Sequence, residues 1–330
     1  MAKTEIVRQA NIQQILDVFI KEEICTKNML HEATGLSLGT CTNLLQKLLA
    51  EGKIIRLEDG PSTGGRKAKR YSIAKNFIQI GLIVLHHHEN SDEVKGKVIN
   101  LRQNEVFSFT QSYEKLKKEK LFELIDQMKT ECPDMKLLAL SIPGIVDQGC
   151  ISFCDIDDLK DTSLQQELSD RFELKIILEN DVNLAALGYD QSLSEKTSSL
   201  ALVYQPSDQY SGCGLIIDGK LVHGATHFAG ELGYLPIETR EQQQKSLKTK
   251  KGATILLAKQ IASLVAIINP DVVIIASKKI SSVEKLKTKI GKWIEARHLP
   301  QLIQIDELDS WIFSGLTHIS LEQLRVKIHL

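Results

Sequence analysis

Residues 223–250 read HGATHFAGELGYLPIETREQQQKSLKTK and begin as a tight turn of small side chains. Gly230 and Gly233 flank a single carboxylate, Glu231, and glycine allows the backbone to approach a ligand closely. No Lys or Arg lies near Glu231 in the sequence, so its oxygens are well placed to accept hydrogen bonds from hydroxyl groups. The turn therefore predicts the wall of a small-molecule site. The Gln-rich and basic residues that follow it predict a plain solvated segment.

Two other turns carry polar or conformationally special residues at strand ends. The segment SIPGIVD places Pro143 and Gly144 at the end of a predicted buried strand, and LENDVN places Glu179, Asn180 and Asp181 at the end of the next one. Polar groups at the carboxyl ends of strands line the crevices in which α/β proteins bind ligands. Helix capping is the alternative role for Asn180 and Asp181, because a helix is predicted to begin there.

Strands and helices alternate along residues 76–330. The predicted strands are 77–85, 96–101, 105–113, 137–146, 175–181, 199–205, 212–225 and 271–277. The predicted helices are 118–132, 163–173, 183–191 and 253–270. This order predicts an α/β fold with mixed sheets in two lobes. A cleft between the lobes is the natural position for a ligand.

The first 75 residues predict a winged helix-turn-helix. Apolar residues recur at helical spacing in 11–23, and two shorter helices follow, one capped by Thr26 and one by Ser37. In the second helix we expect Met29, Leu30 and Ala33 to face inward. The buried stripe of the third helix is expected to comprise Cys41, Leu44, Leu45 and Leu48.

A basic hairpin is predicted after the three helices. Residues 53–74 read as a strand, a turn with Gly and Pro, and a second strand, and four of the five residues 66–70 are basic. Residues 1–75 contain 12 Lys/Arg and 8 Asp/Glu, a net charge of +4, so the remainder carries −5. Such a tip suits a phosphate backbone, and a recognition helix meets base edges near its N-terminus. The candidate DNA-binding residues are Ser37, Gly39, Thr40, Asn43, Lys47, Arg66, Lys67, Lys69 and Arg70.

Composition and short motifs exclude other classes of protein. Apolar residues make up 42% and charged residues 25% of the chain, as in ordinary globular proteins. No apolar run approaches 18 residues and no signal-peptide pattern is present, so we expect a cytoplasmic protein. The six cysteines are expected to be small buried residues. His86, His87 and His88 cannot all point one way on a strand, so they predict an exposed strand end, with a weak metal site as the alternative.

Four segments, in this order, resemble the ROK family (repressors, open reading frames and sugar kinases): SIPGIVD, ILENDVNLAALGY, GCGLIIDGKLVHGATHFAGELGYLPIE and NPDVVIIAS. The resemblance covers most of residues 76–330. The winged helix, with its Gly-Gly-Arg wing, is similar to that of the family's transcriptional repressors. The resemblance implies a two-lobed actin/hexokinase-like (ribonuclease H-like) fold. The implied domains are 1–75, 76–190 completed by the C-terminal helix 315–330, and 191–314.

The same resemblance implies a sugar site formed by Pro143, Gly144, Asn180, Asp181, Glu231 and Tyr234. In the family's kinases the position of Asp181 is the general base that deprotonates a sugar hydroxyl, and the position of Glu231 holds sugar hydroxyls. Tyr234 stands where many relatives have a histidine that binds sugar and zinc. No cysteine lies between Tyr234 and Gly252 to complete such a zinc site, so no metal is expected.

The ATP-binding motifs of the kinases are not matched. Residues 78–88 read IQIGLIVLHHH where the kinases have Asp-x-Gly-x-Thr, and only the short series 212–214 remains of a longer glycine loop. Ala276 and Ser277 stand in place of a Gly-Gly pair. Because phosphoryl transfer depends on positioning and charge stabilisation, we expect no enzymatic activity and no cofactor, with Asp181 as a vestigial base.

Together these features predict a transcriptional repressor of carbohydrate metabolism that binds operator DNA as a homodimer or homotetramer. A sugar or sugar derivative would occupy the cleft, and no membrane is involved. Two alternatives remain: an ATP-dependent sugar kinase with a DNA-binding head, and a ligand-blind regulator that uses the fold as an oligomerisation scaffold. ATP turnover that depends on Asp181 would favour the first, and failure of every sugar to raise the stability would favour the second.

Overall fold

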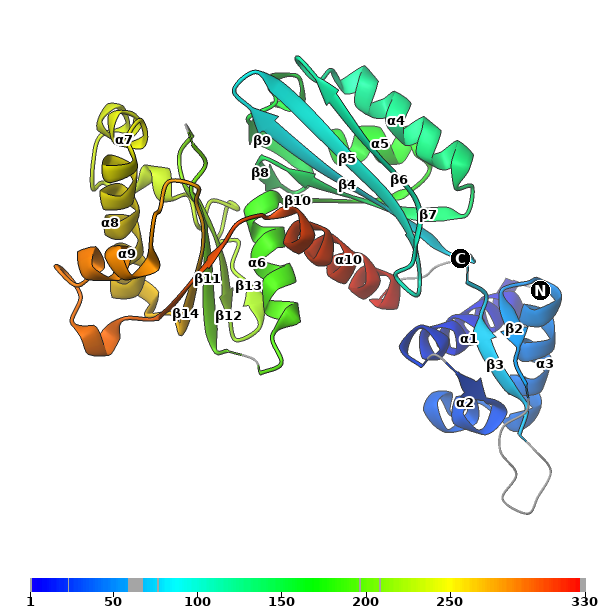
Figure 1. The fold of residues 1–330 in the computed structure, drawn as a ribbon. Coiled ribbons are helices and arrows are strands. Elements are labelled where there is room, and N and C mark those ends of the chain that lie inside the picture. The colour runs from blue at the N-terminus through cyan, green and yellow to red at the C-terminus, as the bar shows by residue number, and fades with distance from the viewer. Residues whose placement is uncertain are drawn as a thin grey trace.

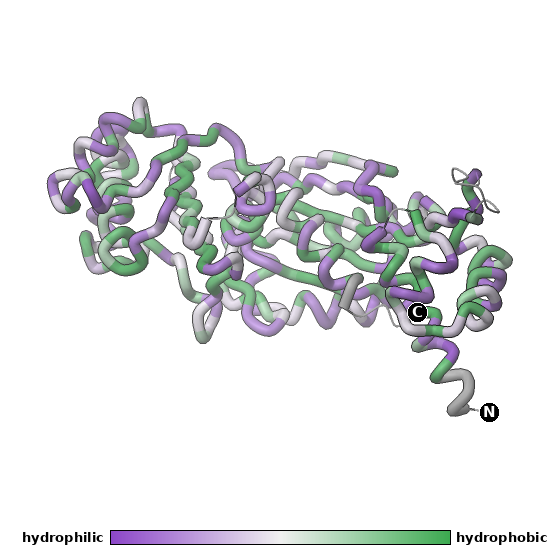
Figure 2. The backbone as a smooth tube through the Cα atoms, turned by 90° about the horizontal axis from the view of Figure 1, so that it is seen from below, coloured by the Kyte–Doolittle hydropathy of each residue, from purple (hydrophilic) through white to green (hydrophobic). Residues whose placement is uncertain are grey.

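The computed structural model describes residues 2–22, 24–58, 68–75, 77–195, 197–207 and 209–326. Figure 1 shows a small head, drawn in blue, followed by two larger lobes that each contain a sheet. Hydrophobic stretches run through the middle of these lobes in Figure 2, and hydrophilic residues gather along their margins. The predicted α/β class and the two mixed sheets are confirmed.

The head contains three helices and a small antiparallel sheet of order β1-β3-β2. Thr26 and Ser37 cap the second and third helices through their hydroxyl groups, as predicted, and Gly35 ends the second helix with φ of 71°. Its elements are α1 (Ala2–Lys21), β1 (Cys25–Thr26), α2 (Lys27–Thr34), α3 (Leu38–Ala50), β2 (Ile54–Arg56) and β3 (Arg70–Ile73).

The burial of α2 differs from the prediction. Leu30 is buried, but Met29 is 38% exposed and Ala33 is exposed as well. The helix has eight residues, and it presents one narrow face to α1 and α3. A helix of two turns can bury one apolar side chain on such a face, so the wider stripe that we predicted was wrong.

The sheet of the first lobe has the order β10-β7-β4-β5-β6. β4, β5 and β6 form an antiparallel meander, whereas β4, β7 and β10 run parallel. Its strands are β4 (Gln79–His88), β5 (Ser91–Asn100), β6 (Glu105–Tyr113), β7 (Met135–Ile142) and β10 (Lys175–Asn180), and its outer helices are α4 (Lys118–Glu131) and α5 (Leu164–Phe172).

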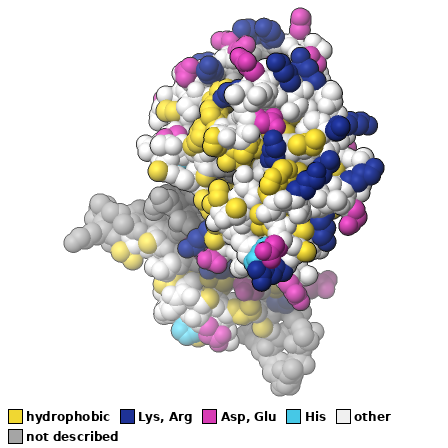
Figure 3. All heavy atoms as spheres, turned by 90° about the vertical axis from the view of Figure 1, so that its left-hand side faces the viewer, with side chains coloured by type: hydrophobic (Ala, Val, Ile, Leu, Met, Phe, Trp, Pro, Cys, Tyr) yellow, Lys and Arg dark blue, Asp and Glu magenta, His cyan; other side chains and the backbone are white. Residues whose placement is uncertain are grey.

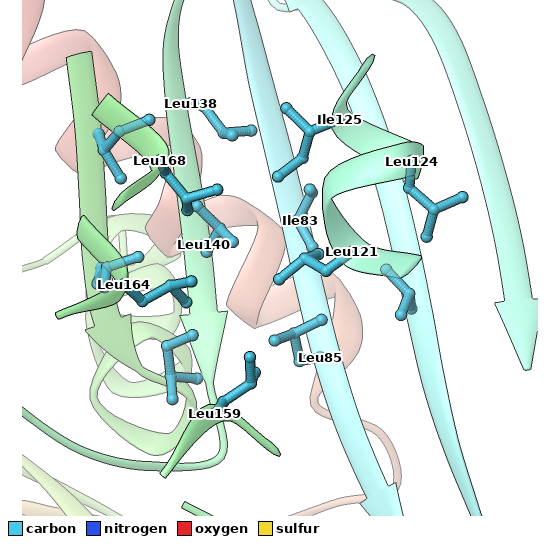
Figure 4. Packing of buried hydrophobic residues seen from close by; sticks show 14 of the residues in the cluster. Ile83, Leu85, Leu121, Leu124, Ile125, Leu138, Leu140, Leu159, Leu164 and Leu168 are labelled. Atoms are coloured by element: carbon cyan, nitrogen blue, oxygen red, sulfur yellow. The ribbon is translucent and has the colours of Figure 1, made fainter. Parts of the chain in front are cut away.

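Strand β4 is buried on both faces, which explains its unbroken apolar run. Ile83 and Leu85 point toward α4 and α5, where Figure 4 shows them packed among leucines of those helices and of β7. Leu82 and Val84 point the other way, into a second core formed with α6 (Asp181–Ser192) and α10 (Asp309–Val326). The carboxyl end of β4 is thereby held between two layers of helices.

The second lobe repeats this layered plan with a sheet of order β13-β12-β11-β14-β15. Helices α8 and α9 cover its outer face and α7 packs against α8, while α6 and α10 lie between the two sheets (Figure 1). Its elements are β11 (Ser199–Tyr204), β12 (Gly212–Ile217), β13 (Lys220–Leu221), α7 (Arg240–Leu247), α8 (Lys250–Ile268), β14 (Val272–Ala276), α9 (Val283–Ile290) and β15 (Gln301–Ile305). Figure 3 shows the side of the molecule that lies at the left in Figure 1, where hydrophobic side chains are interspersed with charges of both signs.

Helices α6 and α10 cross at a point where each helix has a glycine. A Cβ atom added to Gly188 would lie 2.0 Å from the carbonyl oxygen of Trp311, and one added to Gly315 would lie 2.1 Å from that of Leu184. Because both obstacles are backbone atoms, no side-chain adjustment could relieve the contact. The two glycines thus set the distance between the helices that join the lobes.

Some local features were not predicted. Strands β8 (Gly144–Asp147) and β9 (Cys150–Cys154) form a hairpin, and three short 3-10 turns lie at η1 (Asp157–Leu159), η2 (Leu232–Tyr234) and η3 (Ala296–His298). Five cysteines are buried as expected, but Cys150 is exposed, because it begins the short edge strand β9. Residues 240–247, expected to be plain and solvated, form α7 and bury Gln243 and Leu247.

Helix α8 is long and apolar enough to span a membrane by composition, and 56% of its apolar window is buried within the protein. Its apolar residues pack against β11 and β14 in the core of the second lobe. Helix α8 is therefore a core helix of the second lobe.

Candidate functional site

A small cleft lies where the carboxyl ends of the first-lobe strands face a loop of the second lobe. Its lining residues are Gly144, Ile145, Asn180, Val182, Asn183, Gly212, Cys213, His227, Ala229, Gly230 and Glu231. The fold thus brings together Gly144, Asn180 and Glu231, three of the six residues proposed from the sequence. Pro143 and Asp181 are their chain neighbours and do not line the cleft, and Tyr234 faces solvent with 51% of its surface exposed.

The glycine before Glu231 is required by the backbone. Gly230 has φ of 94°, and a Cβ atom there would lie 1.8 Å from the carbonyl oxygen of Cys213. Only glycine allows the turn to lie this close to β12. Glycine at position 230 therefore allows the turn to bring Glu231 into the lining of the cleft.

Asn180 caps helix α6. Its Oδ1 accepts from the backbone N–H of Asn183 at 3.0 Å, and its Nδ2 donates to the carbonyl oxygen of Gly144 at 2.9 Å. The capping role weighed from the sequence is therefore present. The amide also joins the Gly144 turn to the start of α6, so two walls of the cleft are linked through one side chain.

An ion pair joins the two lobes beside the cleft. His223 Nε2 donates to Glu179 Oε2 at 2.8 Å, and Glu179 Oε1 accepts from Asn183 Nδ2 at 3.0 Å. Burial acts to raise the pKa of Glu179, but the hydrogen bonds from His223 and Asn183 outweigh it and hold the pKa below its ordinary value. The hydrogen bond to Glu179 raises the pKa of His223. Both shifts favour the charged forms of the two side chains.

A second histidine extends this contact. The ring of His227 lies 4.8 Å from that of His223, and its Nε2 is 3.7 Å from Asp147 Oδ1 on the β8–β9 hairpin. Glu179 was noted in the sequence only as a polar residue at a strand end, and neither histidine was proposed for the site. Their partners lie far away in the sequence, so no local pattern could have identified them.

Three carboxyl groups in and beside the cleft have raised pKa values. Burial raises the pKa of Asp181 to about 7, and nearby Asp155 and Glu231 act in the same direction. Burial raises the pKa of Glu231 and of Asp155 as well, and Asp155 adds a repulsive effect at Glu231. Hydrogen bonds from the hydroxyl groups of a ligand would stabilise the charged forms of these buried carboxyl groups.

Tyr234 takes part in a stack at the rim. The guanidinium carbon of Arg240 lies 4.3 Å from the Tyr234 ring centre and 4.2 Å from that of Tyr210. Phe228 packs edge-on against Tyr234, with ring centres 4.9 Å apart. The tyrosine at this position thus binds an arginine of α7 and does not point into the cleft, because the turn directs Glu231 inward and Tyr234 outward.

No group of three or more His, Cys, Asp or Glu side chains in the described part of the chain is arranged to hold a metal ion. His86 and His88 lie on one side of β4 and stack, and His87 lies on the other, as strand alternation requires. The prediction of an exposed strand end was wrong for His86. It lies 2.9 Å from Asp309 at the start of α10, because α10 covers that face of the sheet.

Hydrogen bonds within the protein surround Ser277, which stands where the kinases have a glycine. The Lys279 Nζ donates to the carbonyl oxygens of Ser207 and Leu247. Ser277 Oγ donates to Gln205 Oε1 at 3.0 Å, and Gln205 Nε2 donates to Ala253 O at 3.1 Å. These contacts tie the loop after β11 to helix α8 and to the end of β14.

The proposed DNA-binding residues of α3 lie along its outer face. Ser37, Gly39 and Asn43 are exposed, and Thr40 and Lys47 are partly exposed. Ser37 accepts from the backbone N–H of Thr40, and Lys47 pairs with Glu51 at 3.6 Å. Lys69 precedes β3 and Arg70 is the first residue of that strand, whereas Arg66 and Lys67 lie outside the described residues.

The head is attached to the body through the turn between β5 and β6. Arg102 Nη2 donates to Ser72 Oγ of β3 at 2.7 Å, and Ser72 is fully buried. Leu101 of the same turn and Phe77 pack against both the head core and the core between the lobes. Lys53 of the head lies 5.5 Å above the Phe77 ring. A shift of the first-lobe sheet would therefore be transmitted to the head through these contacts.

Comparison with known proteins identifies this architecture. Residues 94–250 match the ROK family, and the xylose repressor of Caldicellulosiruptor bescii is 26% identical over 250 residues, which cover 73% of this chain and 62% of that protein. This part of the chain therefore resembles the ROK family. The Bacillus subtilis xylose repressor is 22% identical over 248 residues, covering 72% of this chain and 63% of that protein.

A further curated relative extends the comparison. The Escherichia coli transcriptional dual regulator NagC is 22% identical over 247 residues, covering 72% of this chain and 60% of that protein. The chain thus matches less than two thirds of the length of these curated relatives.

Solved structures share the ROK fold. A ROK family transcriptional regulator, described as a homologue of the Escherichia coli MLC protein, aligns with 96% of this chain and 99% of its own, with a TM-score of 0.64 and 15% identity. A glucokinase from Streptomyces griseus aligns with 73% of this chain and 98% of its own, with a TM-score of 0.56 and 14% identity. The regulator thus matches the fold of head and body together.

Proposed function

We propose that this protein is a transcriptional repressor of sugar metabolism whose body binds a sugar or sugar derivative and whose head binds operator DNA. The observation that carries the proposal is the attachment of a helix-turn-helix head, through Arg102 and Leu101, to a body whose cleft presents Glu231. The names of the relatives, repressors of xylose and N-acetylglucosamine genes, support the same reading.

The sugar site would be formed by Pro143, Gly144, Asn180, Asp181 and Glu231, with Tyr234, which the resemblance also implies, at the rim outside the cleft. In this proposal Glu231 and the partly buried Asp181 accept hydrogen bonds from sugar hydroxyls. The sugar would alter the closure of the lobes and so the position of the head. Such control requires that the sugar bind the two states with different affinity.

The DNA contacts would come from Ser37, Gly39, Thr40, Asn43, Lys47, Arg66, Lys67, Lys69 and Arg70. Operator sites with two-fold symmetry would be bound by a homodimer or homotetramer in the cytoplasm. We keep the division into residues 1–75, 76–190 with 315–330, and 191–314 as part of this proposal.

We also propose that the protein does not phosphorylate sugars. Lys279 and Gln205 supply hydrogen bonds within the region where the resemblance places nucleotide, so ATP would have to displace them. A ligand-blind scaffold is the second candidate, and the use of both polar atoms of Asn180 within the protein favours it. A search for sugar binding distinguishes the sugar-responsive repressor from the ligand-blind scaffold.

The test measures how sugars change DNA binding. A duplex is selected from a random-sequence library with the wild-type protein, and its affinity is measured by fluorescence anisotropy with D-xylose, D-glucose or N-acetyl-D-glucosamine present. We expect at least one sugar to weaken DNA binding by about tenfold, a typical coupling. Glu231→Ala should remove this effect and leave DNA affinity without sugar unchanged, because the cleft lies far from the DNA-binding face.

Glu241→Ala is the matched control, since Glu241 is an exposed carboxylate on α7 near the same loop. Its response to sugar should equal that of the wild type. If Glu231→Ala responds to sugar like the wild type, the cleft is not the sensor. If no sugar changes DNA affinity or raises the melting temperature, the ligand-blind scaffold is favoured instead.

A further inference from the structure

Two buried amides bind the backbone directly behind Glu231. Gln243 Nε2 of α7 donates to the carbonyl oxygen of Gly233 at 3.0 Å and to that of Glu238 at 3.1 Å. Gln260 Nε2 of α8 donates to the carbonyl oxygen of Leu232 at 3.3 Å. Gln243 is 1% exposed and Gln260 is fully buried. Two consecutive carbonyl groups of the turn are thus held from behind by side chains of two helices.

The orientation of these amides follows from their partners. All three partners are carbonyl oxygens, so each contact requires an N–H group from glutamine. Oε1 of Gln243 and Oε1 of Gln260 have no hydrogen-bond partner in the described part of the protein. Leaving an acceptor buried without a partner is unfavourable, so a leucine would serve better if these positions only filled space. Their use as donors explains why glutamine is present.

The Gln-rich tract that follows the turn is built to present one of these amides. Thr239 and Gln242 form a capping box that starts α7, and this places Gln243 inward and Gln244 outward. Glu238, whose carbonyl is the second partner of Gln243, pairs with Lys259 of α8 at 2.9 Å. The turn, α7 and α8 are therefore joined into one unit by polar contacts.

We propose that Gln243 and Gln260 are positioning residues that fix the turn 228–239 so that Glu231 faces the cleft, without the help of a metal ion. The proposal rests on the proposed function only for the identity of the ligand. The amides bind the carbonyl groups of the two residues that follow Glu231. The residue before Glu231 is Gly230, whose close approach to Cys213 fixes the backbone on that side. The Glu231 side chain is thus located by contacts on both sides of it in the chain.

The decisive experiment compares Gln243→Glu with Gln244→Glu. The two variants have the same composition and the same added charge, on adjacent residues of one helix. Only Gln243→Glu places an acceptor against the carbonyl oxygens of Gly233 and Glu238. Hydrogen–deuterium exchange is measured on peptides covering residues 228–239 of the full-length protein. We expect exchange of the amides of Gly233, Tyr234 and Leu235 to be about tenfold faster in Gln243→Glu and unchanged in Gln244→Glu.

Gln243→Leu and Gln260→Leu remove the donors without adding charge, and they remain informative if Gln243→Glu does not fold. We expect both to keep a melting temperature close to that of the wild type while the same turn amides exchange faster. If the turn exchanges at the wild-type rate in both leucine variants, the positioning role is wrong.

The ligand arm uses calorimetric titration with D-xylose, D-glucose and N-acetyl-D-glucosamine. We expect any sugar that binds the wild type to bind Gln243→Leu and Gln260→Leu about tenfold more weakly, since Glu231 is no longer held in place. Gln244→Glu should bind it normally, and equal affinity in all variants would overturn the role in ligand binding. If none of the sugars binds the wild type, the proposed function fails, and the exchange comparison alone decides the positioning role.

Discussion

Asp155, Asp181 and Glu231 share one electrostatic environment although they come from three separate segments. Each is partly withdrawn from water, and each favours its neutral form more than an exposed carboxyl group does. Asp181 and Glu231 were recognisable in the sequence from the turns that carry them. Asp155 was not, because its effect on the others depends on the folding of the β8–β9 hairpin.

Asp181→Asn tests this environment through stability. The pKa of Asp181 is about 7 in the folded protein against an ordinary value of 3.8. The folded state therefore binds more protons than the unfolded state between about pH 4 and pH 7, and stability falls as pH rises through that window. Asparagine has no proton to lose, so we expect the variant to be more stable than the wild type by about 2–4 kcal/mol at pH 8. The loss of a favourable charge at the start of α6 is smaller, about 0.5 kcal/mol.

Urea denaturation at pH 4, 6 and 8 measures the effect. The gain should be greatest at pH 8 and should vanish near pH 4, where both side chains are neutral. Asp170→Asn, at an exposed position of α5, controls for loss of a carboxylate and should follow the wild-type profile. A variant at position 181 whose advantage does not depend on pH would show that Asp181 is not the titrating group.

Other residues show the limit of sequence reasoning. Gly144, Asn180 and Glu231 were proposed and do line the cleft. Tyr234 was proposed and points to solvent, because adjacent residues of a tight turn face opposite ways. The pair of Glu179 and His223 was not proposed, and its two members lie 44 residues apart. A residue whose role depends on a local turn can be recognised in the sequence. A residue whose role depends on contact between two lobes cannot, because its partner lies far away in the sequence.

At the scale of elements, long apolar patterns were predicted well and short polar ones were not. The helical spacing of apolar residues in 253–270 predicted α8, and the alternation of strands and helices predicted both sheets. Helix α7 was missed because it buries only Gln243 and Leu247, which give no apolar period. The β8–β9 hairpin was missed because its strands have four and five residues.

Gly188→Ala tests the crossing of α6 and α10. The added Cβ atom would lie 2.0 Å from the carbonyl oxygen of Trp311, so the helices must separate. We expect the variant to be less stable by about 2–3 kcal/mol in urea denaturation, a typical cost of overpacking.

Gly291→Ala is the control for this substitution. Gly291 has φ of −60° at the end of α9, and its nearest added contact is at 3.4 Å. Its stability should stay within about 0.5 kcal/mol of the wild type. Equal stability of the two variants would mean that the helices are free to move apart.

In the whole molecule, the head and the body are joined by side chains that pack into both. Leu101 and Phe77 pack against the cores of both, and Arg102 binds the fully buried Ser72. The sequence predicted a head and a body as separate units. No local pattern indicated this junction, since Ser72 lies on β3 of the head and Arg102 lies 30 residues later in a turn of the body.

Arg102→Ala should weaken communication between the sugar cleft and the DNA-binding face. By thermodynamic linkage, the factor by which sugar lowers DNA affinity must equal the factor by which DNA lowers sugar affinity. We expect both factors to fall together in Arg102→Ala, by roughly threefold or more, while the affinity for each ligand alone changes little. Calorimetric titration of sugar with and without DNA measures one factor, and anisotropy measures the other.

Arg171→Ala provides the control, because Arg171 is a surface arginine of α5 that pairs with Asp126 and is remote from the head. Its two coupling factors should be those of the wild type. A full coupling factor in Arg102→Ala would show that the head senses the body by another route.

The ion pair of Glu179 and His223 bears on the timing of ligand entry. It spans the two lobes beside the cleft, so the lobes can separate there only when it breaks. If a ligand enters through that opening, its rate of binding would level off at high ligand concentration, at the rate at which the lobes open.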